Sequence, residues 1–241
     1  KSRISNKKKN IGIIKMEVMR DKMPENDFLK KIRSLTKKHK VVLIFDECTS
    51  GFRETFGGLH KKFKIYPDIA VFGKALGNGY PINAILGKKK FFNKAQESFI
   101  SSTFWTERLG PVAALKTLNL MERKKSWVYI SKLGSYIKKK WEALSKKNGL
   151  KINIYGLSSI CSFSFDRDHL LYKSFITQEM LKNNILATTS IYVSTVHNKK
   201  NLKKYFSILD KLFKKIKEHQ QNKKIKLLKG KICHSSFKRL N

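Results

Sequence analysis

The sequence predicts an α/β fold, with a mostly parallel sheet covered by helices on both faces, and a small α+β domain after it. Two observations predict the first part: short apolar runs alternate with segments of helical periodicity, and Val41–Phe45 is apolar at all five positions. Unbroken runs of this kind are typical of parallel strands that are buried on both faces. A third observation, strand-like runs at Lys151–Tyr155 and Ile160–Phe165 with longer helical patterns around them, indicates the α+β part.

The first half of the chain is expected to alternate between strands and helices. Asp27–His39 carries Phe28, Ile32 and Leu35 at helical spacing, which predicts a helix with one apolar face. The other elements are predicted from shorter patterns: strands at Ile11–Val18, Val41–Phe45, Ile69–Phe72 and Ala84–Leu86, and helices at Lys88–Gln96 and Pro111–Lys125. Such alternation is what β-α-β units produce.

The second half is expected to hold longer helices. Asn148-Gly149 marks the end of a helix that includes Trp141 and Leu144. A helix at about Lys173–Asn183, a strand at Ile191–Thr195 and a long last helix should follow. The last helix carries an apolar stripe at i, i+3 and i+4 spacing, typical of packing on a core: Leu202, Tyr205, Phe206, Leu209, Leu212, Phe213 and Ile216. We expect two domains, residues 1–125 and 126–241, the second comprising a linking helix, the small α+β domain and a basic tail.

The charge of the chain is strongly positive. Its 241 residues include 53 Lys and Arg against 17 Asp and Glu, a formal charge of +36. Such a charge suggests nucleic acid or an anionic membrane as partner. However, only eight of the basic residues are arginine, the side chain that base and phosphate recognition favours. We interpret the lysines as solvated helix faces and tails, and expect weak non-specific adhesion but no specific nucleic-acid partner.

The cysteines and apolar runs indicate the compartment. Cys48, Cys161 and Cys233 are odd in number and too far apart for a CxxC metal or redox motif, so we expect neither a disulfide framework nor a metal site. No apolar run approaches the roughly 18 residues of a membrane span, and the basic start is not followed by the apolar stretch of a signal peptide. A cytoplasmic protein without a membrane partner is the expectation.

Two charged residues are predicted to face one pocket. Asp46 ends the apolar run Val41–Phe45, and Lys74 follows the next expected strand after a tight turn, before the glycine-rich segment Gly77–Gly79. Carboxyl ends of parallel strands form the ligand sites of such sheets. A lysine in a partly apolar pocket loses hydration, its pKa falls, and the neutral amine can form a Schiff base with an aldehyde.

Two other functions also fit parts of this sequence. The segment Val41–Glu47 also fits the apolar strand followed by Asp-Glu with which P-loop ATPases hold magnesium. No GxxxxGK[ST] motif occurs in the sequence, and an ATPase has no need of Lys74. The second alternative is a lysine-rich module that binds nucleic acid through charge alone.

Two segments together resemble a known family. VVLIFDECTSGFRETFGG, from Val41, and PDIAVFGKALGNGYPINAILG, from Pro67, are similar to the core of class III, fold type I pyridoxal-phosphate aminotransferases, including the branch of glutamate-1-semialdehyde aminomutase. SSTFWTERLGPVAALKTL, from Ser101, resembles the next block of the same family. The resemblance is nearly continuous from Ile11 to Ser126 and looser beyond. It implies that residues 1–125 are the C-terminal part of the large, cofactor-binding domain.

The resemblance also implies roles for individual residues. Lys74 would form the Schiff base with pyridoxal 5′-phosphate, and Asp46 would pair with the pyridine nitrogen. Cys48 would pack on the ring face, and Thr49 would lie near the ring hydroxyl. Thr106 would bind the cofactor phosphate of the partner subunit in a homodimer.

The same resemblance implies a longer enzyme. The phosphate cradle and the aromatic side chain that stacks on the cofactor belong to a family N-terminal half that this chain lacks, so the chain alone is expected to be inactive. We call the longer enzyme the parent protein. It is expected to transfer an amino group from a small-molecule amino donor to a carbonyl acceptor, or to shift an amino group within one molecule.

Overall fold

The computed structural model describes residues 11–100 and 107–235. The chain divides into two compact units, Lys1–Val128 and Tyr129–Asn241. Each unit has its own sheet, and the two are described separately.

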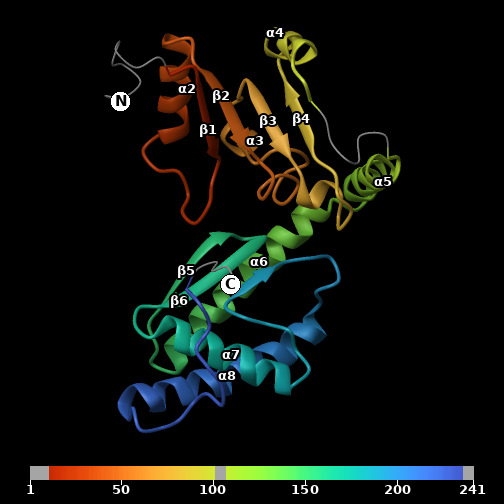
Figure 1. Cartoon of the computed structure of the whole chain (residues 1–241). Coiled ribbons are helices and arrows are strands. Elements are labelled where there is room, and N and C mark those ends of the chain that lie inside the picture. Colours follow the sequence, from red (N-terminus) through yellow and green to blue (C-terminus); the bar gives the residue numbers. More distant parts are fainter. Residues whose placement is uncertain (1–10, 101–106, 236–241) are drawn as a thin grey trace. The chain divides into compact units, whose positions relative to one another are not determined.

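The N-terminal unit is built on a four-stranded sheet. Its strands are β1 (Ile13–Glu17), β2 (Val42–Asp46), β3 (Ile69–Phe72) and β4 (Ala84–Gly87), hydrogen-bonded in the order β1-β2-β3-β4. β1, β2 and β3 are parallel, as predicted, whereas β4 runs antiparallel to β3. In Figure 1 the four strands lie side by side in this order, with α2 (Phe28–Lys38) next to β1 and β2.

Further helices complete this unit. The expected helix at Lys88–Gln96 is two short pieces, α4 (Lys89–Phe92) and the 3-10 helix η2 (Asn93–Glu97). The remaining helices are α3 (His60–Phe63), the 3-10 helix η1 (Lys74–Leu76) and α5 (Leu109–Lys124), of which α5 packs against η1.

The face of α2 differs from the sequence expectation. The helix forms where the spacing predicts it, but its buried residues are Leu29 and Thr36, while Phe28 is 47% exposed. Ile32 and Leu35 are half-buried, whereas Phe28, the first helical residue, is exposed and Leu29 is buried. The apolar spacing thus predicted the helix, and Phe28 is the position at which the apolar face departs from it.

Alternation along β2 and β3 gives the sheet one buried and one half-open face. Leu43, Phe45 and Glu47 are fully buried, whereas the intervening Ile44 and Asp46 are only half-buried. Successive side chains of a strand point to opposite faces, so Asp46 lies on the half-open face. The apolar run predicts burial on both faces; within the described residues only one face is closed.

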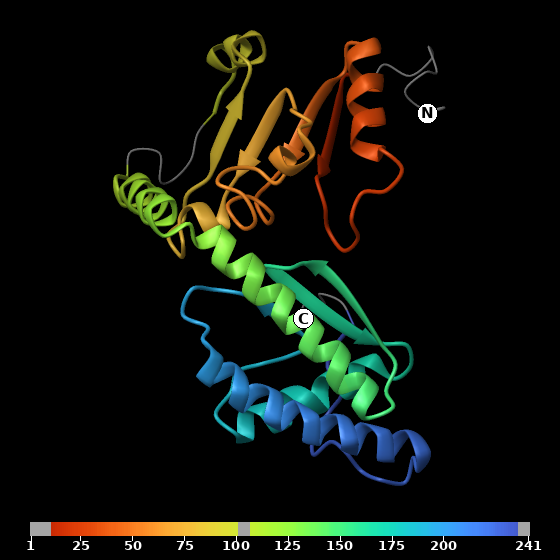
Figure 2. The same ribbon diagram turned by 180° about the vertical axis from the view of Figure 1, so that it is seen from behind.

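The C-terminal unit packs three helices on an antiparallel sheet. Its strands are β5 (Ile152–Leu157), β6 (Ile160–Phe165) and β7 (Ser190–Tyr192), in the order β5-β6-β7. Its helices are α6 (Ser126–Lys147), α7 (His169–Lys182) and α8 (Lys199–Gln221). Figure 2 shows α6 crossing in front of β5 and β6, and α8 crossing α7.

Aromatic side chains fill the core of this unit. Phe163 of β6 meets Trp141 of α6 and Phe213 of α8 edge-on, at ring-centroid distances of 4.8 and 5.8 Å. Phe165 meets Tyr172 of α7 in the same way at 5.0 Å. The predicted stripe of the last helix is confirmed, because all seven residues of the stripe are buried.

Among residues 11–100 and 107–235, no helix combines the length and the low polarity that crossing a bilayer requires.

Candidate active site

Asp46 and Lys74 lie at the carboxyl ends of neighbouring parallel strands. Asp46 is the last residue of β2, and in the parallel register it lies opposite Val71 of β3. Lys74 follows the end of β3 by two residues and begins η1. The adjacency of these two strand ends, expected from the sequence, is therefore found in the structure.

Lys74 is held by a hydroxyl group. Its Nζ donates a hydrogen bond to Thr49 Oγ1 at 2.7 Å, joining the loop after β2 to the turn after β3. The side chain is exposed rather than enclosed in the partly apolar pocket that the sequence suggested. Its backbone has φ of +45°, in the left-handed region that a residue with a Cβ occupies at a cost.

Gly73 brings the end of β3 close to two neighbouring side chains. A Cβ on Gly73 would lie 2.4 Å from Asn83 Oδ1, so the end of the Asn83 side chain would have to shift, and 3.5 Å from Cys48 Sγ, which is an ordinary contact. Gly73 thereby packs the end of β3 against Cys48, one of the predicted cofactor contacts.

Asp46 is an ionised acceptor. Cys48 donates its backbone N–H to Asp46 Oδ1 at 3.1 Å, and Lys15 Nζ lies 3.0 Å from Oδ2. Burial alone would raise the pKa of Asp46, but these hydrogen bonds outweigh burial and hold the pKa below its ordinary value. A carboxylate at this position can therefore accept a further hydrogen bond.

Cys48 is a protonated thiol. Partial burial, together with its hydrogen bond to Asp46 and the charge of that carboxylate, raises the pKa of Cys48 above its ordinary value. The positive charges of Lys74 and Lys15 oppose this shift without cancelling it. A neutral thiol is suited to packing against a ligand rather than to nucleophilic attack.

Glu47 anchors the loop that carries Cys48 and Thr49, a role that the sequence reasoning missed. Its buried carboxylate accepts the backbone N–H of Leu59 and of His60, the ring nitrogen Nδ1 of His60, and the hydroxyl of Ser50. These bonds tie the loop at both of its ends. The signal was present in the sequence, since an alternating strand that buries Phe45 also buries the residue two positions later.

Lys15 is the second residue that the sequence reasoning missed. It lies on β1, opposite Ile44 of β2 in the parallel register, and so shares the half-open face with Asp46. A single lysine within the apolar segment Ile11–Val18 was the available signal.

The predicted residues thus form one continuous group where the structure describes them. Asp46 contacts Cys48 through its backbone N–H, and Thr49 contacts Lys74 through its hydroxyl. Thr106, the predicted phosphate ligand, lies outside the described residues.

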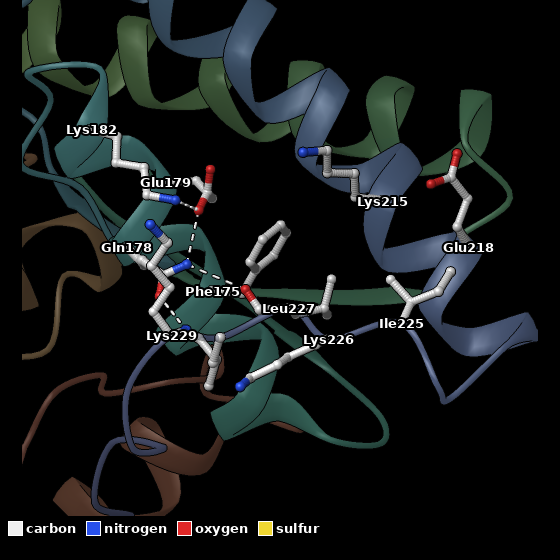
Figure 3. A pocket seen from close by; sticks show the side chains of 11 residues that line it. Phe175, Gln178, Glu179, Lys182, Lys215, Glu218, Ile225, Lys226, Leu227 and Lys229 are labelled. Atoms are coloured by element: carbon white, nitrogen blue, oxygen red, sulfur yellow. Dashed lines mark hydrogen bonds and ion pairs between the residues drawn. The ribbon is translucent and has the colours of Figure 1, made fainter.

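Two cavities lie elsewhere. A pocket of about 530 Å³ in the C-terminal unit is formed by α7, α8 and the chain after α8 (Figure 3). Gln178 donates to the carbonyl of Leu227 and accepts from the backbone N–H of Lys229 across this pocket, so the side-chain amide of Gln178 holds the segment after α8 in place.

An apolar pocket of about 380 Å³ in the N-terminal unit lies beside β3, lined by Ala70 and Phe72 among others. Neither is lined by a predicted site residue.

The chain is similar to proteins of one known family. Residues 19–228 match the family described as aminotransferase class-III. Among curated proteins, the chain is 34% identical over 168 residues to 3-aminobutyryl-CoA aminotransferase of Cloacimonas acidaminovorans (strain Evry), which covers 68% of this chain and 41% of that protein. It is 30% identical over 214 residues to glutamate-1-semialdehyde 2,1-aminomutase of Wigglesworthia glossinidia brevipalpis, which covers 81% of this chain and 49% of that protein. The chain spans about half the length of these relatives or less.

Solved structures share the fold. The internal aldimine form, with PLP, of the FumI protein of Sphingopyxis sp. MTA144 matches with a TM-score of 0.81 at 21% identity, covering 88% of this chain and 53% of that one. Acetylornithine aminotransferase from Elizabethkingia anophelis matches with a TM-score of 0.75 at 24% identity, covering 87% and 58%. The matched architecture is the expected fold type I.

Proposed function

The chain belongs to the class-III aminotransferase family, and we propose that its parent protein transfers amino groups between small molecules with pyridoxal 5′-phosphate as cofactor. The observation that carries the proposal is that an amine, Lys74, and an ionised carboxylate, Asp46, lie at adjacent ends of parallel strands within this family. Neither an ATPase nor a charge-driven nucleic-acid module requires this pair.

The residues present fit the cofactor. It offers an aldehyde, a ring nitrogen, a ring hydroxyl and a phosphate, and the group holds an amine (Lys74), a carboxylate (Asp46) and a hydroxyl (Thr49). When bound, the cofactor supplies a ring that accepts the electrons released at the substrate α carbon. The lowered pKa of Asp46 keeps its carboxylate charged, which is the state that accepts a ring N–H.

Each side chain then has a defined task. Lys74 would hold the aldehyde carbon of the cofactor through Nζ, and once released would move the proton at the substrate α carbon. Asp46 would accept the ring N–H, Thr49 would bond to the ring hydroxyl, and Cys48 would pack on the ring as a neutral thiol. Thr106 would bind the cofactor phosphate of the partner subunit.

The partners follow from the same proposal. The parent protein would take a small-molecule amino donor and a carbonyl acceptor, act as a homodimer and work in the cytoplasm. Residues 1–125 would belong to the large cofactor-binding domain, and residues 126–241 would comprise the linking helix, the small domain and the basic tail. Three free cysteines suit a reducing compartment.

An intramolecular amino shift is the second candidate. Relatives of both types match: one is an aminotransferase, and the other is an aminomutase. The two activities differ in a single-turnover experiment. With an amino donor and no acceptor, a transaminase releases one deaminated product per site, whereas an aminomutase returns an isomer of its substrate.

The cofactor assignment is tested by reductive labelling. The parent protein is loaded with pyridoxal 5′-phosphate, treated with borohydride and mapped by peptide mass spectrometry, and the label is expected on Lys74. Lys74→Ala should lose both the label and the deamination of an amino donor. Lys31→Ala, which removes an exposed lysine of α2, is the matched control and should retain both. A stable label on another lysine in the wild-type protein would refute the assignment.

A further inference from the structure

Both carboxylate oxygens of Asp46, the residue proposed to bind the cofactor ring nitrogen, already have partners in this structure. Its Oδ2 already forms an ion pair with Lys15 Nζ at 3.0 Å, and its Oδ1 already accepts the backbone N–H of Cys48 at 3.1 Å. Lys15 reaches Asp46 along the half-open face of the sheet, from the strand next to β2. Lys15 therefore approaches Asp46 on the half-open face of the sheet, the face on which we place the cofactor ring nitrogen.

The ion pair is unlike one that stabilises the fold. The side chain of Lys15 is 62% exposed and that of Asp46 is 25% exposed. Exposed pairs of this kind contribute little to folding, because solvent screens them and both side chains lose freedom. We expect Lys15 instead to change the affinity of Asp46 for a second ligand, the cofactor ring nitrogen.

A carboxylate has room for another donor. Two oxygens offer about four acceptor sites, of which Lys15 and the backbone N–H and thiol of Cys48 occupy three. A cofactor ring nitrogen could thus bind Asp46 without expelling Lys15. However, a protonated ring nitrogen is a cation, and it would share one carboxylate with the ammonium of Lys15. Like charges at close range disfavour the charged form of the group that can lose its proton.

We propose that Lys15 is a positioning residue that weakens the hold of Asp46 on the cofactor ring nitrogen, and so lowers the fraction of the ring that is protonated. This inference rests on the proposed function and deepens it, because it assigns a control on the electronics of the cofactor to a residue outside the predicted group. Cys48 and Glu17 also interact electrostatically with Lys15, and Lys74 interacts in turn with Cys48.

The direction of the effect follows from charge. A ring that is less protonated withdraws electrons less strongly from the substrate α carbon, so Lys15 would moderate reactivity as well as affinity. Removing the ammonium should make Asp46 a better acceptor. The cofactor should then bind more tightly, and its ring nitrogen should keep its proton to higher pH.

The test uses the parent protein loaded with pyridoxal 5′-phosphate that is ¹⁵N-labelled in the ring. Wild type is compared with Lys15→Met, which keeps the aliphatic stem, and with Lys31→Met, which removes an equal charge from the exposed surface of α2. We expect Lys15→Met to lower the dissociation constant of the cofactor about fivefold, within the range of exposed ion pairs. The pH at which the ¹⁵N signal reports loss of the ring proton should rise by about half a unit, and Lys31→Met should change neither quantity.

An Asp46→Asn background separates the possible outcomes. If Lys15 acts through Asp46, Lys15→Met should have no further effect in that background. An unchanged signal in Lys15→Met, with a clear shift in Asp46→Asn, would overturn this inference and leave the proposed function standing. If Asp46→Asn also gives the same ring ¹⁵N signal as wild type, both the role of Asp46 and this inference are wrong. Weaker cofactor binding by a folded Lys15→Met protein would also overturn the inference, because it would show that Lys15 supports the cofactor.

Discussion

Replacing Glu47 by Gln should destabilise the N-terminal unit by about 3 kcal/mol. Oε1 of Glu47 accepts the backbone N–H and Nδ1 of His60, each at 2.9 Å, and Oε2 accepts Leu59 N–H at 2.9 Å and the Ser50 hydroxyl at 2.5 Å. A glutamine keeps only one acceptor oxygen. Whichever way its amide turns, a backbone N–H, that of Leu59 or that of His60, faces an NH₂ group and loses its acceptor.

The magnitude follows from these four bonds. A buried donor without an acceptor costs about 1–3 kcal/mol, and the bonds that survive lose the assistance of the negative charge, roughly a further 1 kcal/mol. A sum of about 3 kcal/mol is a large share of the roughly 5–15 kcal/mol by which domains are stable. The loop with Cys48 and Thr49 should loosen first, because Glu47 is its anchor.

Urea unfolding and hydrogen exchange measure the two consequences. The free energy of unfolding should fall by the stated amount, and amides of residues 47–60 should exchange faster in Glu47→Gln. Glu142→Gln removes a carboxylate that is 55% exposed and paired with Lys146, and it should change stability by less than about 0.5 kcal/mol. If Glu47→Gln unfolds at the same urea concentration as Glu142→Gln, the anchoring role is wrong.

The same carboxylate predicts a pH dependence. Burial raises the pKa of Glu47, but the donors of His60, Ser50 and Leu59 outweigh burial and hold the pKa below its ordinary value. A lowered folded-state pKa contributes stability that is present above the unfolded-state value, about 4.3, and lost as pH falls through the folded-state value. The difference in stability between wild type and Glu47→Gln should therefore narrow below about pH 4.

Other substitutions test the backbone at the site, the core and a buried ion pair. Lys74→Gly should be more stable than Lys74→Ala by about 1 kcal/mol in urea, because φ of +45° costs a residue with a Cβ; equal stabilities would contradict strain at this position. Phe163→Ala should cost about 3–5 kcal/mol in the unfolding of the C-terminal unit, since this ring is fully buried; a loss below 1 kcal/mol would be the opposing result. Asp68→Asn removes a partner of Arg33, and although burial raises the pKa of Asp68, hydrogen bonds lower it to about 2. The stability lost in Asp68→Asn should be complete above about pH 5 and should fade as pH falls through the folded-state pKa of about 2, and a loss independent of pH would contradict the ion pair.

Local patterns in the sequence predicted most of the fold. The apolar runs located β2 and β3, and the stripe from Leu202 to Ile216 located α8 and its buried face. Patterns do not report strand direction, so the antiparallel β4 was not foreseen. The exposure of Phe28 in α2 was not foreseen, because helical spacing fits Leu29 as well, and only tertiary packing decides which of the two is buried.

The parts of the site that depend only on neighbouring residues in the sequence could be predicted. Asp46 and Lys74 were found because each follows a recognisable strand, and parallel strands bring their carboxyl ends together. Lys15 was not found, because its relation to Asp46 depends on the register between β1 and β2. The hydrogen bond between Lys74 and Thr49 likewise depends on how two loops meet in space.

The neighbouring acids Asp46 and Glu47 show why this segment admits little change. The alternation of β2 continues through both, so that Asp46 lies with Ile44 on the half-open face and Glu47 with Phe45 on the buried face. One residue inserted after Phe45 would exchange the two faces, since a strand repeats every two residues. Asp46 would then be buried among donors placed for a longer side chain, and the inserted residue would take its place near Lys15. The predicted site and the anchor of its loop therefore depend on one register, which ties the chemistry of this edge of the sheet to the stability of the unit.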